Sequence, residues 1–217
     1  MTGAAPPGRD ALAVLRRNAA APPVAVADAD EVCELCGVAV AAEHRHLVDL
    51  ETRTLRCACR PCWLLFPDGA QQRYRAVPER HLSFPGFTLT RSQWEALEIP
   101  VGLAFFLRSS LLGRPGVERD QPAGAAESAL PLGAWDDVAA ANPALAELRT
   151  DVEALLVRAG DLADPQCFLV PVDRCYELVG RLRRVWRGFD GGAEARAELA
   201  GFLADVAARS RPAGGAR

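Results

Sequence analysis

The chain contains no lysine, so arginine supplies all of its strongly basic side chains. These 25 arginines face 28 aspartates and glutamates, and the formal net charge of the 217 residues is −3. Proteins that bind nucleic acid usually carry a clearly basic surface. The slightly acidic balance therefore disfavours a nucleic-acid partner.

Long apolar runs are also missing from the sequence. A membrane-spanning helix needs about 20 consecutive apolar residues, and no segment provides them. The first residues, MTGAAPPGRD, do not resemble a secretory signal, and no apolar stretch of the twin-arginine type follows Arg16 and Arg17. We therefore expect a cytoplasmic protein, in which seven cysteines favour metal ligation or free thiols over disulfides.

Recognisable catalytic motifs are a third absence. The sequence shows no phosphate-binding loop, dinucleotide fingerprint, nucleophile elbow or paired-carboxylate site. Its three histidines offer no identifiable base and orienting group for a nucleophilic cysteine. The sequence therefore favours a non-enzymatic role and assigns no catalytic residue.

Two short cysteine pairs are the most informative feature that is present. Cys33 and Cys36 lie in CELCG, Cys59 and Cys62 lie in CRPC, and 22 residues separate the pairs. This spacing is typical of a four-cysteine metal site, in which each tight turn supplies two thiolates. Four thiolates saturate a tetrahedral ion and leave no position for water, so we predict a structural Zn²⁺ site.

A fifth cysteine and the CELCG sequence leave alternatives open. Cys57 lies two residues before Cys59, so it either replaces Cys59 as a ligand or is a spare thiol. A glycine after the second cysteine is also typical of rubredoxin, whose four cysteines hold an iron that carries one electron. Because tetrahedral sulfur ligation suits both metals, iron is the alternative cofactor.

The histidines and the remaining cysteines have less specific interpretations. His44 and His46 lie two residues apart before and within a predicted strand, so they point to the same face. They are candidates for a second metal or for replacing a cysteine, but surface histidines are the favoured interpretation. His81 has no partner in the sequence, and we expect Cys167 and Cys175 to pack in the core.

Composition divides the chain into four parts. Residues 1–30 are rich in alanine and proline and are expected to be a mobile N-terminal segment. Residues 31–67 form the four-cysteine metal-binding lobe, residues 68–209 an α+β domain, and residues 210–217 a frayed tail. Predicted strands over 46–50 and 54–57 form a hairpin between the cysteine pairs, as in zinc-ribbon and treble-clef-like modules.

The middle of the chain predicts mixed α and β structure. A strand is predicted over 74–77, and Thr90 with Gln93 forms a capping box that opens a helix through Leu97. The apolar run 102–107 predicts a strand that is buried on both faces. Residues 112–127 indicate a loop or a weak edge hairpin.

The second half of the chain is predicted to be mostly helical. One helix ends at Asn142, and Pro143 begins a second, whose apolar stripe is Leu145, Leu148, Val152, Leu155 and Leu156. After a strand over 168–170, Asp173 is expected to cap an amphipathic helix. A final helix follows a glycine turn and completes a helical hairpin. The fold class is thus α+β, with a four-cysteine lobe, a mixed middle region and a helical C-terminal half.

Three segments of the sequence resemble an uncharacterised actinobacterial family encoded beside high-affinity uptake nickel–iron hydrogenases. They are CELCGVAVAAEHRHLVDLETRTLRCACRPC, ESALPLGAWDDVAAANPAL and VPVDRCYELVGRLRRVWRGFDGG. The resemblance extends from about residue 10 to residue 205. It implies a role in hydrogenase assembly, in iron or nickel handling, or in electron delivery, with a hydrogenase subunit or maturation factor as the partner.

These observations lead to three hypotheses for function. The first is a zinc-stabilised accessory or adaptor protein linked to nickel–iron hydrogenase assembly or function. The second is a rubredoxin-like one-electron carrier with iron in the four-cysteine site. The third, disfavoured by the acidic charge balance, is a nucleic-acid-binding zinc ribbon.

Overall fold

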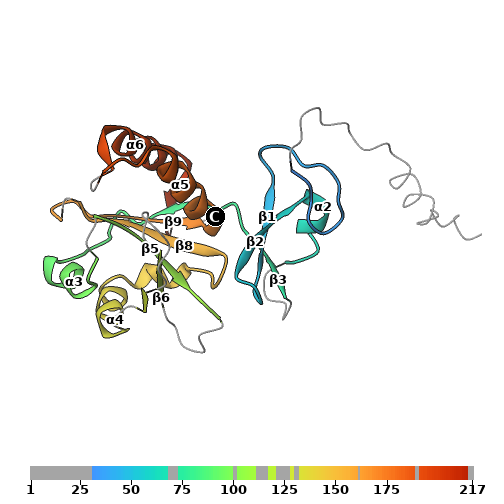
Figure 1. The fold of residues 1–217 in the computed structure, drawn as a ribbon. Helices are drawn as coiled ribbons and strands as arrows, with labels where there is room; N and C mark the ends of the chain where they lie inside the picture. Colours follow the sequence, from blue (N-terminus) through green and yellow to red (C-terminus); the bar gives the residue numbers. More distant parts are fainter. Residues whose placement is uncertain are drawn as a thin grey trace, which may run out of the picture.

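The computed structural model describes residues 31–67, 73–99, 102–110, 117–120, 128–129, 132–160, 162–188 and 191–214. These residues form a small three-stranded sheet and a large seven-stranded sheet, which lie side by side in Figure 1. The expected mobile segment over residues 1–30 lies outside the described residues.

The small sheet contains the predicted hairpin and one further strand. Strands β1 (Arg45–Asp49) and β2 (Thr54–Ala58) pair antiparallel, and β3 (Tyr74–Ala76) pairs with the other edge of β1. The side chain of Asp49 accepts the backbone N–H groups of the turn at Glu51 and Thr52. The sheet of the cysteine lobe therefore extends beyond residue 67, where the sequence had placed the end of the lobe.

The large sheet has the strand order β10-β4-β9-β8-β5-β6-β7. Every neighbouring pair is antiparallel except β10 with β4, which is parallel. The strands are β4 (Leu82–Ser83), β5 (Leu103–Arg108), β6 (Val117–Asp120), β7 (Ser128–Ala129), β8 (Glu153–Arg158), β9 (Gln166–Pro171) and β10 (Arg211–Pro212). The three longest strands, β9, β8 and β5, lie together at its centre.

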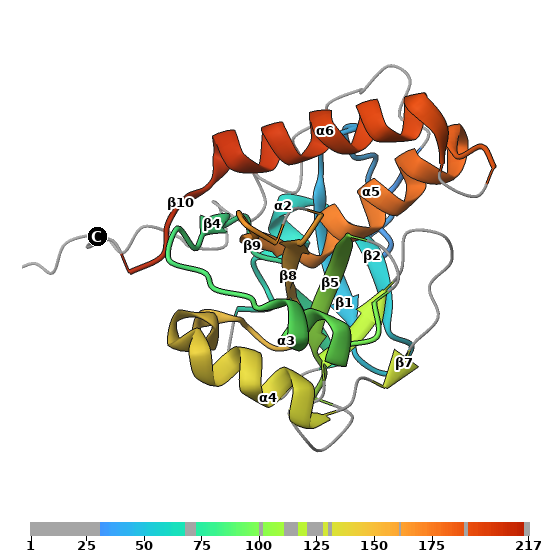
Figure 2. The ribbon, with the colours of Figure 1, turned by 90° about the vertical axis from the view of Figure 1, so that its left-hand side faces the viewer.

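Helices cover both faces of this sheet (Figures 1 and 2). On one face lie α3 (Arg91–Ala96), α4 (Leu132–Ala141) and the short 3-10 helix Pro143–Glu147. On the other lie α5 (Val172–Val185) and α6 (Gly192–Arg209), which pack against each other. Both layers bury apolar side chains, so the central strands are apolar on both faces.

Successive side chains of the central strands point to opposite faces of the sheet, and this alternation divides the core into two clusters. Phe106 and Leu155 belong to the cluster under α3 and α4, where the ring of Phe106 stacks on Trp135 with centroids 4.6 Å apart. Phe105 and Leu156 belong to the cluster under α5 and α6. This is the pattern expected of a strand between two helical layers, since successive side chains point to opposite faces.

The predicted helix after Pro143 is wrong. A 3-10 helix ends at Glu147, and the chain then forms β8, which lies between β5 and β9. Leu155 and Leu156 are both fully buried, one on each face of the sheet. A short apolar run fits a doubly covered strand as well as a buried helix, and pairing with β5 and β9 decides for the strand. The C-terminal half is therefore only partly helical, because besides α4, α5 and α6 it supplies β8 and β9, two of the three central strands of the large sheet.

Several other predicted elements are confirmed, with two corrections at their ends. The capping box of Thr90 and Gln93, the buried strand after residue 102 and the C-terminal helical hairpin are all present. Asp173 does not cap α5, because the N-cap is Pro171 and Asp173 lies in the first helical turn. The expected tail is partly ordered, since Arg211 and Pro212 pair with β4.

Apolar contacts and ion pairs join the two sheets. Val48 of β1 and Val77, which follows β3, pack with Val152, which precedes β8, and with Val172, the first residue of α5. Beside them, Arg80 contacts both carboxylate oxygens of Glu153, at 2.6 and 2.9 Å. The small sheet is thus held against one end of the large sheet and of α5.

Candidate metal centre

The first cysteine pair lies in a tight turn that its own backbone holds closed. The N–H of Cys33 donates to the carbonyl of Val38, and the N–H of Gly37 donates to the carbonyl of Cys33, both at 2.8 Å. Gly37 has φ +74°, a left-handed conformation that glycine adopts without a steric penalty. The glycine of CELCG is therefore needed for the turn that aims both sulfurs at one point.

The second cysteine pair opens a helix. Cys59 is the N-cap of α2 (Arg60–Trp63), and Cys62 lies within that helix. The N–H of Trp63 donates to the carbonyl of Cys59 at 2.9 Å, and the indole N–H of Trp63 donates to the carbonyl of Val77 at 3.0 Å. The helix is thereby fixed to the end of β3, and the second pair of sulfurs is fixed with it.

The four cysteines of the two pairs come together, as the spacing predicted. The four sulfur atoms all lie within 4.8 Å of one another; they belong to Cys33, Cys36, Cys59 and Cys62. The sulfurs of Cys36 and Cys59 are 3.7 Å apart, and all four are free thiols. A tetrahedral ion with zinc–sulfur bonds of about 2.3 Å holds its sulfurs about 3.8 Å apart. The chain therefore contains a four-cysteine group whose geometry fits a metal ion.

The thiols of this group differ in acidity because of their surroundings. Burial opposes ionisation of Cys33, but hydrogen bonds from the backbone, those of Cys59 and Leu35 first, lower its pKa to about 6. Burial and the neighbouring sulfurs raise the pKa of Cys59 and Cys62. The thiol of Cys33 thus ionises readily, and the resulting thiolate makes ionisation of Cys59 and Cys62 harder. A bound divalent cation removes this conflict, because it stabilises all of the thiolates together.

Glu34, a residue that the sequence analysis did not single out, joins the first cysteine turn to the hairpin. Its carboxylate accepts the backbone N–H of Cys57 at 2.8 Å and the Nη1 of Arg56 at 2.7 Å. The ion pair with Arg56 lowers the pKa of Glu34. The backbone N–H of Glu34 also donates to the carbonyl of Cys57 at 2.9 Å. In the sequence, the only indication that Glu34 takes part in the site is its position between Cys33 and Cys36.

Cys57 lies outside the four-cysteine group and close to two histidines. Its sulfur and one ring nitrogen from each of His44 and His46 lie within 4.8 Å of one another. The interpretation as surface histidines does not hold for His44, because only 7% of its side chain is exposed. His46 is partly exposed and contacts Asp173 of α5. Sequence spacing could show that the histidines share a face, but not that Cys57 lies beside them.

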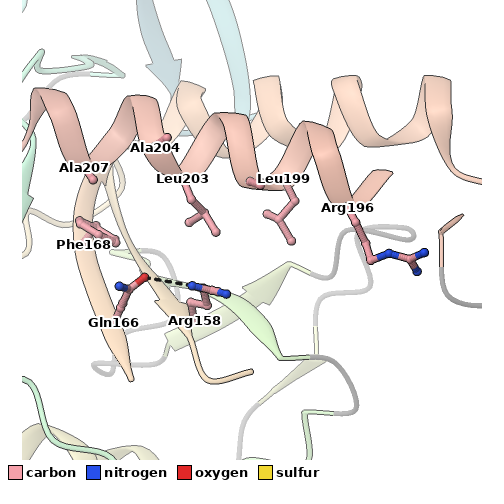
Figure 3. Close-up of a pocket in the computed structure, with 9 residues that line it drawn as sticks. Arg158, Gln166, Phe168, Arg196, Leu199, Leu203, Ala204 and Ala207 are labelled. Atoms are coloured by element: carbon pink, nitrogen blue, oxygen red, sulfur yellow. Dashed lines mark hydrogen bonds between the residues drawn. The ribbon is translucent and has the colours of Figure 1, made fainter. Parts of the chain in front are cut away.

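Two of the grooves that the described residues form show which groups are accessible. One of about 980 Å³ lies between the cysteine lobe and the helical layer of α5 and α6, and His44, His46 and His81 are among its lining residues. The other, of about 480 Å³, lies under α6 (Figure 3). Leu199 and Leu203 point into this second groove, whose polar groups are two arginines and a glutamine. The imidazole groups of the lobe therefore face the first groove.

None of the described helices is long and apolar enough to cross a membrane.

Comparison with known proteins identifies a family for the chain. A search of curated proteins and a search of solved structures found no match. The model of the family of unknown function DUF5947 matches residues 32–210, a segment that includes the four-cysteine group and every strand of the two sheets except β10. The chain therefore belongs to the DUF5947 family.

Proposed function

We propose that this protein is a zinc-stabilised accessory or adaptor protein that binds a protein partner in the assembly or function of a nickel–iron hydrogenase. The observation that carries the proposal is the convergence of four thiols within 4.8 Å of one another. Four thiolates complete the coordination of a tetrahedral ion, so the metal at this position serves the fold of the lobe. A lobe that is folded around such an ion has no open metal position for chemistry, and it presents a surface to which a protein partner binds.

The form of the two cysteine turns favours zinc over iron. Gly37 shapes the first turn, whereas the second pair opens α2 and has no corresponding glycine. A turn, a hairpin and a helix in this order resemble a treble-clef-like zinc module. Rubredoxin instead uses two similar turns, so the one-electron carrier with iron is the alternative.

Exposed apolar side chains on the lobe support a protein partner. Val32 and Val38 flank the first cysteine turn, and Leu64 and Leu65 follow the second; each exposes between 37% and 65% of its surface. Among the residues that the structure describes, Tyr176 is the one other exposed large hydrophobic residue. The two neighbouring leucines are therefore the candidate contact for a protein partner, since contiguous exposed apolar groups mark binding surfaces.

The hydrogenase link and a cytoplasmic location rest on the resemblance and composition of the sequence. A zinc ribbon that binds nucleic acid is the third candidate, and the net charge of −3 disfavours it. Titration of the protein with DNA and RNA at low salt tests this candidate, because phosphate contacts are strongest there. We expect no binding.

Metal analysis together with a visible spectrum tests the identity of the ion. The full-length chain, purified without added metal, is expected to hold zinc and to be colourless. Iron with sulfur-to-iron charge-transfer bands would instead support the electron carrier. The two outcomes are distinct because zinc has a filled d shell and no redox chemistry.

Co-purification tests the partner. We expect a tagged chain to recover a hydrogenase subunit or maturation factor from cells that make the enzyme. A double variant, Leu64→Ser with Leu65→Ser, is expected to lose this partner. The matched control is Tyr176→Ser, which removes an exposed hydrophobic residue on α5 and is expected to retain it. Recovery of no hydrogenase component by the wild-type chain would contradict the proposal.

A further inference from the structure

We propose that His44, His46 and Cys57 form a second metal site, separate from the four-cysteine group, that binds a divalent transition-metal ion such as Zn²⁺. One ligand atom from each of the three residues lies within 4.8 Å of the others. Zinc holds nitrogen at about 2.0–2.1 Å and sulfur at about 2.3 Å, so its ligands lie roughly 3.5 Å apart. The three atoms therefore lie within about 1.3 Å of the separation that a bound ion requires.

The hairpin places the three side chains on one face. His46 in β1 is directly opposite Cys57 in β2. His44 precedes His46 by two residues, and the two rings lie 4.7 Å apart between centroids. Side chains two residues apart on a strand, and those directly opposite across an antiparallel pair, share a face. The backbone of the lobe therefore fixes the geometry of this group.

Hydrogen bonds set the orientation of both imidazole rings. Nδ1 of His44 lies 2.8 Å from the carbonyl oxygen of Ala41, and Nδ1 of His46 lies 2.9 Å from Oδ2 of Asp173. A carbonyl and a carboxylate oxygen accept hydrogen bonds, so each Nδ1 carries the hydrogen. In the neutral rings the lone pair then belongs to Nε2, which is the atom that binds a metal. Carboxylate and carbonyl partners of this kind orient metal-binding histidines in known sites.

The free nitrogen of His44 is an independent indication of a ligand. Its Nε2 is buried and has no hydrogen-bond partner among the described residues. The side chain as a whole is only 7% exposed. A buried polar atom without a partner costs stability, and a metal ion satisfies it. The ordinary alternative, a surface histidine pointing into water, does not fit this burial.

The donor set determines the class of ion and the character of the site. Two imidazoles and a thiolate suit zinc, cobalt, nickel or copper, and do not suit magnesium or calcium, which prefer oxygen. Three protein ligands leave the fourth position of a tetrahedral ion open, unlike the closed four-cysteine group. His44 and His46 line the groove of about 980 Å³. An exchangeable ligand or a metal in transfer can therefore approach this site from the groove.

Equilibrium dialysis of the full-length chain against a fixed concentration of free Zn²⁺ tests the site. We expect the wild type to bind one ion per chain more than His46→Gln or Cys57→Ser at the same free Zn²⁺. The difference is independent of which metal the four-cysteine group holds, so failure of this proposal is distinct from failure of the proposed function. The matched control is His81→Gln, which changes a histidine of the same groove and is expected to bind as the wild type does.

A second variant separates ligation from folding. Asp173→Asn retains all three ligands and alters only the partner of His46. We expect its affinity for the second ion to fall about tenfold to a hundredfold, as for other histidine-orienting carboxylates. Equal Zn²⁺ uptake by the wild type, His46→Gln and Cys57→Ser would overturn the proposal. An unchanged affinity in Asp173→Asn would overturn the orienting role of Asp173.

Discussion

At the scale of single residues, the surroundings of each cysteine decide its chemistry. Four thiols gather between two turns, and Cys57 lies with two histidines. Cys167 and Cys175 are buried in the two core clusters of the large sheet, as the sequence predicted. Burial raises the pKa of the Cys167 thiol, so it behaves as an apolar group.

The first prediction concerns a ligand of the four-cysteine group. Cys33→Ser is expected to release the ion of this group and to unfold the cysteine lobe, because metal binding and folding are coupled in small metal sites. Metal analysis and amide hydrogen exchange of β1 and β2 measure the two effects. The control is Cys175→Ala, a core cysteine outside the lobe, which is expected to retain the metal content of the wild type. Full metal content in Cys33→Ser would contradict the ligand assignment.

The second prediction concerns the pH dependence of stability at His81. Burial is the main reason why the pKa of this histidine lies below 6.5, and the charges of Arg174 and Arg209 lower it further. The carboxylates of Asp173 and Asp205 raise the pKa of His81, but by less than burial and the arginines lower it. The unfolded chain therefore binds a proton at His81 more readily than the folded chain does. This contribution to stability is complete above about pH 6.5 and is lost as the pH falls through the folded-state pKa.

Replacement of His81 measures that contribution. We expect the free energy of unfolding of the wild type to fall more steeply below about pH 6.5 than that of His81→Gln. Urea denaturation at a series of pH values provides the comparison. Parallel pH profiles for the two proteins would show that the burial of His81 does not affect stability in acid.

At the scale of elements, local sequence signals and long-range pairing differ in what they decide. The short helix α3 is specified locally: Thr90 accepts the N–H of Gln93, and the side chain of Gln93 accepts the N–H of Thr90. Strand β8 is decided by its neighbours, because its apolar residues suit a buried helix or a buried strand equally well. The sequence therefore predicted α3 correctly and β8 incorrectly.

The third prediction tests the capping box. Thr90→Ala removes the side chain that accepts the N–H of Gln93 and is expected to lower the free energy of unfolding by about 1 kcal/mol. The control is Glu95→Ala, an exposed position within the same helix, for which we expect a change of less than about 0.5 kcal/mol. Chemical denaturation measures both. Equal losses in the two variants would argue against a specific contribution of the cap.

At the scale of the whole molecule, the connection between the two sheets is partly ionic. Glu153 is fully buried at the start of β8, where it accepts two hydrogen bonds from Arg80 and one from the backbone N–H of Arg149. Arg80 lies in the segment between β3 and β4, which leads from one sheet to the other. The pair therefore fixes the connecting segment to the centre of the large sheet.

The fourth prediction tests this buried ion pair. Arg80→Gln leaves the carboxylate of Glu153 without its cationic partner and is expected to cost about 3 kcal/mol of stability. The control is Arg209→Gln, which removes an exposed pair with Asp205 on α6 and is expected to cost about 0.5 kcal/mol or less. Urea denaturation measures both variants. Similar losses of unfolding free energy in the two variants would show that burial does not increase the contribution of an ion pair to stability.

Features that depend on neighbours along the chain could be predicted from the residues alone. The spacing of the four cysteines, the hairpin between them and the capping box at Thr90 all follow from contacts within a turn or between adjacent strands. The amphipathic patterns of α5 and α6 are also local, since one face of each helix repeats with the helical period. These features were predictable for that reason.

Contacts between residues that are distant in sequence became visible only in the folded chain. His46 contacts Asp173 across 127 positions of sequence, and Arg80 contacts Glu153 across 73. Cys57 gains its histidine neighbours through the register of the hairpin, and β8 gains its strand conformation from the edges of β5 and β9. Such contacts depend on the packing of whole sheets and helices, because burial and long-range hydrogen bonding outweigh local preference.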